Sequence, residues 1–215
     1  MLHLTVPNVR YTLNVPNVWY NVNRSIIFLE LRQAMAKQTY IPSLLNLFRQ
    51  YGYDGVTLSK ISQATGLGKA SLYHHFPGGK DEMVETVLIS LQQALEQIVA
   101  ETLDREGDAL TRLQRMCDRI NKTYDSGQKP CLLAALMLGS AKDMFQEQVR
   151  QLLQVWIEAI ANVLIESGMD EKLAWQRGED GVIAIQGALI LSQGLDDPSP
   201  FQRVIKQLPQ TLCQK

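Results

Sequence analysis

The sequence predicts an all-α protein, and three observations support this fold class. From Met35 onward, residues that begin and end helices follow one another almost without interruption. The segments between them carry apolar residues at helical spacing. No stretch alternates between apolar and polar residues for long enough to predict a sheet. We therefore expect three short helices near the N-terminus, followed by a larger helical bundle.

Residues 1–34 differ in character from the rest of the chain. They are rich in asparagine and valine and contain the near-repeats VPNVRY, from Val6, and VPNVWY, from Val15. No helical stripe occurs before RSIIFLELRQA. Two interpretations are open. Either Met35 is the initiator and the preceding residues are translated leader sequence, or these residues form a flexible arm with a short helix at its end. In both cases residues 1–36 are treated as an N-terminal extension.

Three short helices are predicted after this extension. The first begins near Pro42, because proline is tolerated in the first turn of a helix, and continues to Gly52. Thr57 is suited to cap the second helix, LSKISQAT, which Gly66 terminates. The third helix, KASLYHHF, is ended by the sequence PGG.

Longer helices are predicted after residue 80. Asp81 and Glu82 begin a fourth helix that extends to about Asp104, with both carboxylates at its positive end. Further helices are expected to begin at five positions. These are Asp108, Pro130, Ser140, Asp170 and the pair Ser199-Pro200.

The second and third helices, joined by TGLG, have the arrangement of a helix-turn-helix motif. Ile61 and Ala64 are expected to face inward on the second helix, and Leu72 and Phe76 form an apolar stripe on the third. The opposite face of the third helix carries polar and small residues. These are Lys69, Ala70, Tyr73 and His74, with Ser71 at the edge. Lysine and a ring hydroxyl reach phosphates, and small residues allow close approach to base edges, so this face is suited to a DNA groove.

Charge is unevenly distributed although the formal net charge is only −1. Residues 37–80 contain five basic residues and one acidic residue, Asp54. The rest of the chain holds the other 16 basic and 21 acidic residues, out of totals of 21 and 22. A basic end on an acidic body allows a nearly neutral protein to bind DNA.

Other kinds of site are disfavoured by residue spacing. Gly78-Gly79-Lys80 lacks the GxxxxGK[ST] spacing of a phosphate-binding loop. The adjacent histidines His74 and His75 point about 100° apart on a helix, with no cysteine near them in sequence, so neither a metal site nor a cofactor is predicted. No nucleophile elbow and no close Cys/His pair indicates catalysis, and the protein is not expected to be an enzyme.

Cysteine content and hydropathy indicate a cytoplasmic protein. Cys117, Cys131 and Cys213 are odd in number and widely spaced, so a disulfide framework is not expected. The longest strongly apolar run, VIAIQGALIL, has ten residues, which is too few to cross a bilayer. The N-terminus lacks the layout of a secretory signal.

The segment LFRQYGYDGVTLSKISQATGLGKASLYHHFPGGKDEMVETVL resembles the DNA-binding segment of the TetR family of bacterial transcriptional regulators. The resemblance implies a DNA-binding domain at residues 37–84 and an effector-binding and dimerisation domain at residues 85–215. It also implies direct contacts to operator DNA, with Lys80 near a phosphate at the start of the fourth helix. The residues implied are Thr57, Lys69, Ser71, Tyr73, His74, His75 and Lys80. A packing role is the alternative for His75 and Tyr73.

Three further segments resemble the LmrA/YxaF-like branch of that family. They are FPGGKDEM, CLLAALMLGS and GALILSQGLDDPSPFQRVIKQL. Members of this branch carry a G-C-x-x-A-x-L motif in the regulatory domain. Here Lys129 and Pro130 precede Cys131, where glycine is usual.

The second half of the chain is expected to form a helical bundle and a homodimer. The segment MFQEQVRQLLQVWIEAIANVLIESG carries an apolar stripe broad enough to contact more than one neighbour. GVIAIQGALIL is apolar nearly all round, so it is either a central core helix or a helix covered by a second subunit. The family resemblance favours the second interpretation, with the last two long helices forming a four-helix interface. A two-fold dimer then predicts a palindromic operator.

An apolar cavity is expected to hold a small effector. The residues proposed to line it are Met116, Tyr124, Leu132, Leu133, Met137, Met144, Phe145 and Trp156, each of which is otherwise an ordinary core residue. The branch resemblance implies an uncharged aromatic or apolar effector. Oxidation of Cys131 is a weaker alternative. The predicted function is thus a homodimeric repressor released from its operator by an effector. The alternative is a helical ligand-binding protein, or an enzyme, that has lost DNA binding.

Overall fold

The computed structural model describes residues 4–6, 9–11, 37–103 and 106–214, and it divides into two units, Met1–Tyr40 and Ile41–Lys215. In the first unit, strands β1 (Leu4–Val6) and β2 (Val9–Tyr11) pair antiparallel, with Leu4 opposite Tyr11 and Val6 opposite Val9. This pair was not predicted from the sequence, because three-residue strands are too short to show alternation. The predicted short helix before Met35 lies outside the described residues.

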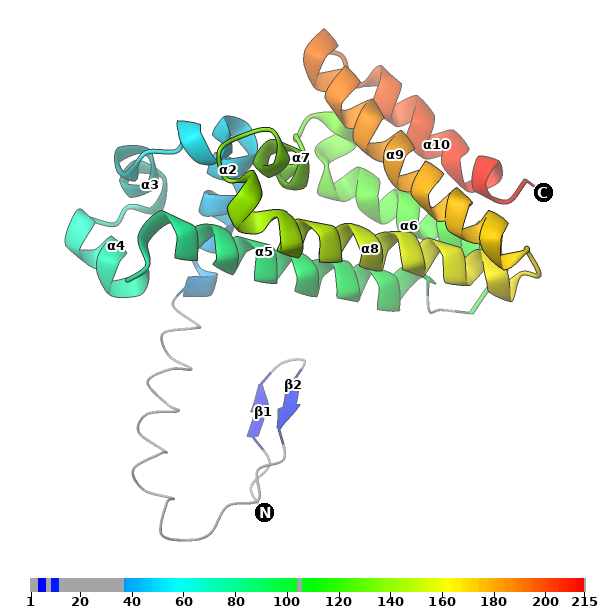
Figure 1. Cartoon of the computed structure of the whole chain (residues 1–215), viewed down its shortest axis with the longest axis horizontal. Helices are drawn as coiled ribbons and strands as arrows, with labels where there is room; N and C mark the ends of the chain where they lie inside the picture. The colour runs from blue at the N-terminus through cyan, green and yellow to red at the C-terminus, as the bar shows by residue number, and fades with distance from the viewer. Residues whose placement is uncertain (1–3, 7–8, 12–36, 104–105, 215) are drawn as a thin grey trace, which may run out of the picture. The chain divides into compact units, whose positions relative to one another are not determined.

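Helices α2 (Ile41–Gly55), α3 (Leu58–Thr65) and α4 (Lys69–His75) begin the second unit, in which the predicted all-α class is confirmed (Figure 1). The helical conformation of α2 is interrupted at Gly52, whose φ of 62° favours glycine. Thr57 caps α3, its hydroxyl accepting a hydrogen bond from the backbone N–H of Lys60 at 3.3 Å. Gly66 ends α3 with a left-handed φ of 72°. The three predicted short helices are confirmed.

The predicted fourth helix corresponds to α5 (Gly79–Ile98), which continues into the π-helical turn η1 (Val99–Leu103). The carboxylate of Glu82 accepts a hydrogen bond from the backbone N–H of Gly78 at 2.8 Å and so caps the start of α5. Three shorter elements follow. They are α6 (Ala109–Thr123), capped by Asp108; the 3₁₀ turn η2 (Asp125–Gly127); and α7 (Leu132–Met137).

Two helices of 25 residues and one of 14 complete the chain: α8 (Lys142–Glu166), α9 (Glu171–Leu195) and α10 (Ser199–Leu212). The carboxylate of Asp170 caps α9, and Pro200 lies in the first turn of α10, as predicted. Helices α8 and α9 pack closely where Gly178 faces the Ile157 carbonyl. A Cβ atom on Gly178 would lie 2.6 Å from that oxygen, so this crossing requires glycine.

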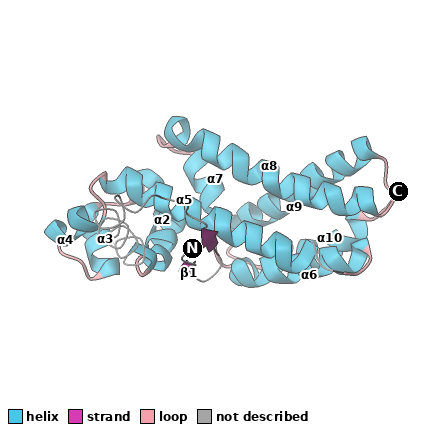
Figure 2. Ribbon diagram, turned by 90° about the horizontal axis from the view of Figure 1, so that it is seen from below, coloured by secondary structure: helices cyan, strands magenta, loops and turns pink. Residues whose placement is uncertain are grey.

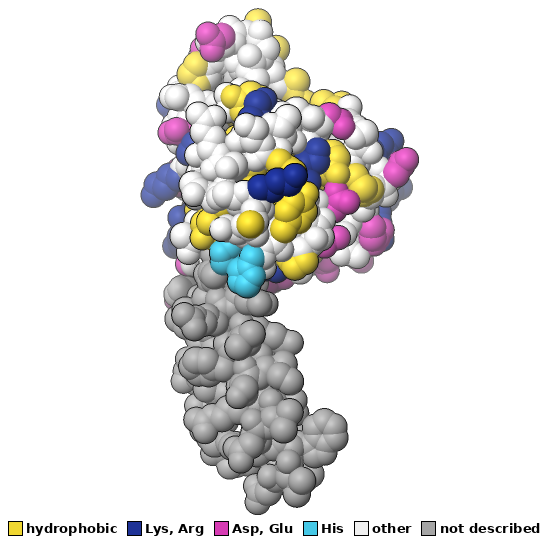
Figure 3. All heavy atoms as spheres, turned by 90° about the vertical axis from the view of Figure 1, so that its left-hand side faces the viewer, with side chains coloured by type: hydrophobic (Ala, Val, Ile, Leu, Met, Phe, Trp, Pro, Cys, Tyr) yellow, Lys and Arg dark blue, Asp and Glu magenta, His cyan; other side chains and the backbone are white. Residues whose placement is uncertain are grey.

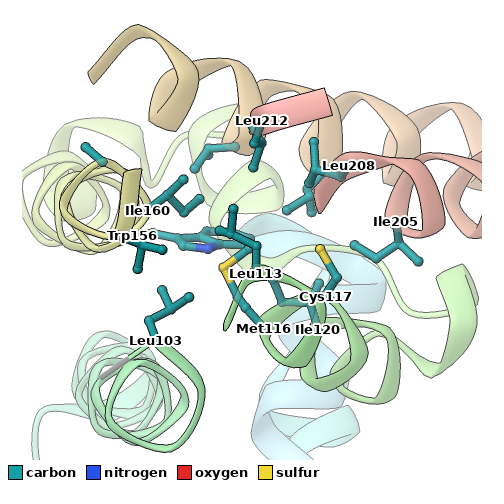
Figure 4. Packing of buried hydrophobic residues seen from close by; sticks show 14 of the residues in the cluster. Leu103, Leu113, Met116, Cys117, Ile120, Trp156, Ile160, Ile205, Leu208 and Leu212 are labelled. Carbon is teal, nitrogen blue, oxygen red and sulfur yellow. The ribbon is translucent and has the colours of Figure 1, made fainter. Parts of the chain in front are cut away.

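The larger core lies among α6, α8, α9 and α10, while α2, α3 and α4 gather at the other end of this unit (Figure 2). Leu113 and Met116 of α6 lie next to Trp156 of α8, and Cys117 points toward Leu208 and Ile205 of α10 (Figure 4). Among the described residues, no helix is long and apolar enough to cross a bilayer. The helices position two features, an exposed face on α4 and a cavity beside α2.

Candidate nucleic-acid interface and ligand cavity

Side-chain hydrogen bonds to the backbone fix the turn between α3 and α4. The hydroxyl of Ser62 donates to the Leu67 carbonyl at 2.6 Å. The hydroxyl of Thr65 donates to the Ile61 carbonyl at 2.7 Å and accepts from the Leu67 N–H at 3.3 Å. These bonds satisfy backbone groups at the end of α3 and set the direction in which α4 leaves the turn.

The outward face of α4 is polar and exposed, and its inward face is buried. Leu72 and Phe76 are 1% and 0% exposed, which confirms the predicted apolar stripe. The side chains predicted to face solvent are all exposed. They are Lys69, Ala70, Ser71, Tyr73 and His74. On α3, Ile61 is buried as expected, but Ala64 is exposed, because Ile61 and the half-buried Leu58 supply the apolar contact of this short helix.

The structure places His75 and Lys80 differently from the exposed residues. His75 is half-buried, and its ring centre lies 5.4 Å from that of His74 in an edge-on arrangement. The Lys80 ammonium donates to the carbonyls of Tyr53, at 3.0 Å, and Val56, at 3.4 Å, and lies 3.9 Å from the centre of the Tyr53 ring. Lys80 thus ties the start of α5 to the end of α2, and its contact with a phosphate stays a prediction.

Lys60 is held in the same way as Lys80. Its ammonium donates to the Gly55 carbonyl at 2.9 Å and lies 3.7 Å from the centre of the Tyr51 ring. Lys69, in contrast, is exposed, and its side chain makes no hydrogen bond or ion pair within the described part of the chain. Of these three lysines, Lys69 is therefore the one whose charge is free to meet a phosphate.

Two polar residues of α3 were missed by the sequence analysis. Ser59 and Gln63 are exposed and line an open groove between α3 and α4 together with Lys69. Basic side chains lie near the middle of this end of the molecule, histidine lies at its lower edge, and acidic side chains lie mostly toward its rim (Figure 3). A helix-turn-helix with exposed polar groups on both helices presents one continuous surface to a DNA groove.

The end of α2 is fastened to α5 and to the loop before α8. The Tyr53 hydroxyl donates to the carboxylate of Asp81, and its ring packs against Phe145 with 6.1 Å between ring centres. Burial and the Asp81 carboxylate raise the pKa of Tyr53 to about 12. Asp54 accepts hydrogen bonds from both the hydroxyl and the backbone N–H of Ser140, and these bonds lower the pKa of that carboxyl.

A cavity of about 80 Å³ lies between α2, α5, α6, α7 and α8. Its walls are mainly aliphatic and aromatic. The lining residues are Arg49, Leu91, Ala94, Leu95, Ile98, Ile120, Thr123, Tyr124, Cys131, Leu132, Leu133, Leu152 and Trp156. Four of the eight predicted lining residues are among them, namely Tyr124, Leu132, Leu133 and Trp156.

The other four predicted lining residues lie elsewhere. Met116 is fully buried in the core between α6 and α8. Phe145 packs against Tyr53, and Met144 is 47% exposed because it lies on the outer side of α8. Met137 ends α7 and is not part of the cavity lining. Methionine content does not distinguish a cavity wall from a core or a surface.

The polar side chains of the cavity were only partly anticipated. Tyr124 is buried, its hydroxyl donates to the sulfur of Cys131 at 3.5 Å, and burial raises its pKa well above the usual range. Arg49, which the sequence analysis did not assign to the cavity, is 9% exposed, and its guanidinium lies 5.6 Å from the Tyr124 ring centre. The signal in the sequence was its position, because Arg49 follows Phe48 and lies four residues after Leu45 within the apolar stripe of its helix.

Helix α9 has one exposed apolar face. Ile183, Ile190 and Leu195 are 67%, 59% and 60% exposed, and Gly187 lies between them with open space around it. Ile183, Gly187, Ile190 and Gly194 recur at helical spacing and form a continuous strip along the helix, and the exposed Leu191 and Leu195 lie beside it. GVIAIQGALIL is therefore buried on one side and exposed on the other within a single chain.

Two family models match the chain over the segments that form these features. The model of bacterial regulatory proteins of the tetR family matches residues 44–87, and that of the LmrA/YxaF-like transcriptional regulator C-terminal domain matches residues 109–207. This chain belongs to the TetR family of bacterial transcriptional regulators. As a TetR-family member of the LmrA/YxaF-like branch, it is a DNA-binding transcriptional regulator.

Relatives and solved structures agree with the TetR assignment. The HTH-type transcriptional regulator YxaF of Bacillus subtilis is 24% identical over 81% of this chain and 93% of its own length. The HTH-type regulator LmrA of the same species is 22% identical over 82% and 96%. A TetR regulator structure from Legionella pneumophila aligns with a TM-score of 0.71 at 21% identity, covering 81% of this chain and 96% of that one. These TetR relatives are HTH-type transcriptional regulators.

Proposed function

We propose that this TetR-family regulator is a homodimeric repressor that binds a palindromic operator and is released from it by a small effector. The observation that carries the proposal is the exposed polar face of α4. Lys69, Ser71 and Tyr73 lie on it, while Leu72 and Phe76 anchor the helix from behind. A recognition helix needs polar side chains that are free to meet DNA and apolar side chains that hold it to the domain, and α4 has both.

The proposed division into domains places residues 37–84 in the DNA-binding domain and residues 85–215 in the regulatory domain. The boundary falls inside α5, which is continuous from Gly79 to Ile98. A continuous helix transmits a movement of the regulatory domain directly to the DNA-binding end. This arrangement supports release by an effector that changes the position of α5.

The apolar strip on α9 supports the dimer. Large exposed apolar side chains that form one continuous strip are typical of a surface covered by another protein. Because the strip is formed by residues of one long helix, a second copy packed about a two-fold axis covers it most simply. Two recognition helices then meet two half-sites about one helical turn of DNA, or a multiple of it, apart.

The cavity supports an effector with an aromatic or apolar body. Its walls include the rings of Tyr124 and Trp156 and several leucines. At about 80 Å³ it is smaller than the roughly 300–1,000 Å³ of typical ligand sites, so the surrounding helices must separate to admit an effector. A coupling of about 1–3 kcal/mol between this opening and operator binding changes operator affinity about 5- to 150-fold.

Fluorescence anisotropy over a salt series tests the proposal, with DNA from upstream of the protein's own gene and random DNA as the competitor. We expect preferential binding to one site, and a Lys69→Ala variant with a shallower salt dependence, by about one unit for each phosphate that the variant no longer neutralises. Lys206→Ala, an exposed lysine on α10, is the matched control and keeps the full salt dependence. A Lys69→Ala variant that also keeps it contradicts the assignment. A protein that binds apolar molecules but no DNA site anywhere in its genome is a ligand-binding protein that has lost DNA binding.

A further inference from the structure

Arg49 is the one charged side chain among the described residues that line the cavity. It is 9% exposed, and its Nε atom has no hydrogen-bond partner. No carboxylate in the described ranges forms an ion pair with it. A cation buried to this extent without an opposite charge is costly, because the Tyr124 ring and the remaining contact with water compensate it only in part. The site is therefore incomplete as it stands.

The groups around Arg49 favour a flat, electron-rich partner. Its guanidinium lies over the ring of Tyr124, and the indole of Trp156 lines the same cavity. Near Tyr124 lies a second buried polar group, the side-chain amide of Gln186, for which the structure has no hydrogen bond that meets the distance and angle criteria. A guanidinium binds a carboxylate through two parallel hydrogen bonds, and such charge-assisted bonds are about twice as strong as neutral ones.

We propose that the effector is an aromatic carboxylate whose carboxylate group pairs with Arg49. The ring system lies among Tyr124, Trp156 and the cavity leucines, and the two carboxylate oxygens accept hydrogen bonds from the guanidinium. This inference rests on the proposed function and deepens it, since it replaces an uncharged effector with an anionic one.

The position of Arg49 gives this pairing a regulatory consequence. Arg49 belongs to α2, whose C-terminal end carries Tyr53 and Asp54, the residues held by α5 and by Ser140. An anion bound to Arg49 therefore contacts a helix of the DNA-binding domain directly. A ligand shifts a conformational equilibrium only as far as it binds one state better than the other. Here the state favoured is the one in which α2 moves to complete the ion pair.

Matched pairs of acids and amides test the proposal on the full chain. Benzoate, 2-naphthoate and 4-biphenylcarboxylate are each compared with their primary amides by isothermal titration calorimetry. We expect at least one acid to bind the protein about tenfold or more tightly than its amide, as expected for a charge-assisted pair. Three acids that all bind no better than their amides, or that do not bind, overturn the proposal.

Variants at position 49 test whether the tighter binding of the acid depends on Arg49. Arg49→Met is expected to abolish the preference for the acid, because it weakens binding of the acid far more than binding of the amide. Arg49→Lys keeps the positive charge and is expected to retain part of the preference for the acid. Arg150→Met, an exposed arginine of α8 paired with Glu147, is the matched control and keeps the full preference. An Arg49→Met variant that folds and still prefers the acid overturns the proposal, and the comparison on the unmodified protein stands even if that variant does not fold.

Operator binding separates this inference from the proposed function. The preferred acid is expected to weaken operator binding by the unmodified protein and by Arg150→Met, but not by Arg49→Met. Site-specific DNA binding without any preference for acids removes the inference and leaves the repressor proposal intact. A preference for acids that depends on Arg49, in a protein without a DNA site, removes the repressor proposal and leaves the anion site.

Discussion

Asp54 at the end of α2 accepts two hydrogen bonds from Ser140 in the loop before α8, and the bond from the Ser140 N–H to the Asp54 carboxylate measures 3.0 Å. These residues are 86 positions apart, so their contact joins the helix-turn-helix region to the regulatory bundle. Gly139 makes room for the contact, since a Cβ atom there would lie 2.9 Å from the carboxylate. A carboxylate suits this position because one of its oxygens accepts from the Ser140 N–H and the other from the Ser140 hydroxyl.

Replacing Asp54 by asparagine is expected to lower the melting temperature at neutral pH. The further fall in melting temperature on acidification is expected to be smaller in the variant than in the unmodified protein. Because the Ser140 hydrogen bonds lower the folded-state pKa of Asp54, its stabilisation is present above the unfolded-state pKa of about 4 and is lost as the pH falls through the lower folded-state value. Melting curves from pH 7 to pH 2.5 measure this. Asp118→Asn, an exposed carboxylate on α6, is the control. Equal acid dependence in the Asp54→Asn variant and the unmodified protein contradicts the prediction.

Removing the Tyr53 hydroxyl is expected to alter stability at alkaline pH. The folded-state pKa of Tyr53 is raised to about 12, so its contribution is intact below pH 10 and is lost as the pH rises through the folded-state value. In Tyr53→Phe the ring still packs against Phe145 and under Lys80, but the ionisable group is gone. Denaturant melts between pH 9 and pH 12 are expected to show a smaller decline for the variant. A parallel decline in both proteins rules out this role of the hydroxyl.

Gly178→Ala is expected to destabilise the chain by about 2 kcal/mol or more, because the added methyl group would force α8 and α9 apart at their crossing. Gly187→Ala, on the same helix, has open space at the new methyl group and is expected to be neutral or slightly stabilising within one subunit. Urea denaturation of the two variants compares them. Similar losses for both would show that the close approach at Gly178 does not limit packing.

Ile190→Glu is expected to convert the proposed dimer into monomers, because a carboxylate placed at the centre of the apolar strip on α9 cannot be buried unpaired. Light scattering coupled to size-exclusion chromatography measures the mass. Leu138→Glu is the matched control, since Leu138 is 85% exposed but lies at the end of α7, away from the strip. An Ile190→Glu variant that remains dimeric places the interface elsewhere.

The sequence predicted the helices well where local chemistry determines them. Thr57, Asp108 and Asp170 each cap the helix that they were expected to begin, and Gly66 ends α3. These signals act within one helical turn, so they are readable without knowing the tertiary structure. The exposed face of α4 was predictable for the same reason, since seven residues and one apolar stripe define it.

The cavity was less predictable because it depends on how distant helices pack. Met116, Met137, Met144 and Phe145 were placed in it from their chemistry, yet apolar residues occur equally in cores and on outer helix faces. The bonds of Lys80 to the carbonyls of Tyr53 and Val56 were not predictable for the same reason, and its contact with a phosphate stays a prediction. The position of Arg49 within an apolar stripe indicates a buried charge, but the sequence does not show which groups surround it.

Because α5 is continuous, a small tilt at its cavity end would produce a larger displacement at its other end, next to the helix-turn-helix. Its 20 residues from Gly79 to Ile98 span about 30 Å at 1.5 Å per residue. If the cavity end tilts by about 5° when its helices separate, the other end moves by roughly 2.5 Å over that length. In a two-fold dimer the displacements of the two subunits add, so the recognition helices shift by about 5 Å against a groove repeat of roughly 34 Å. In the proposed mechanism, a cavity opening of atomic dimensions would thereby be enlarged into a mismatch with the spacing of the two DNA half-sites.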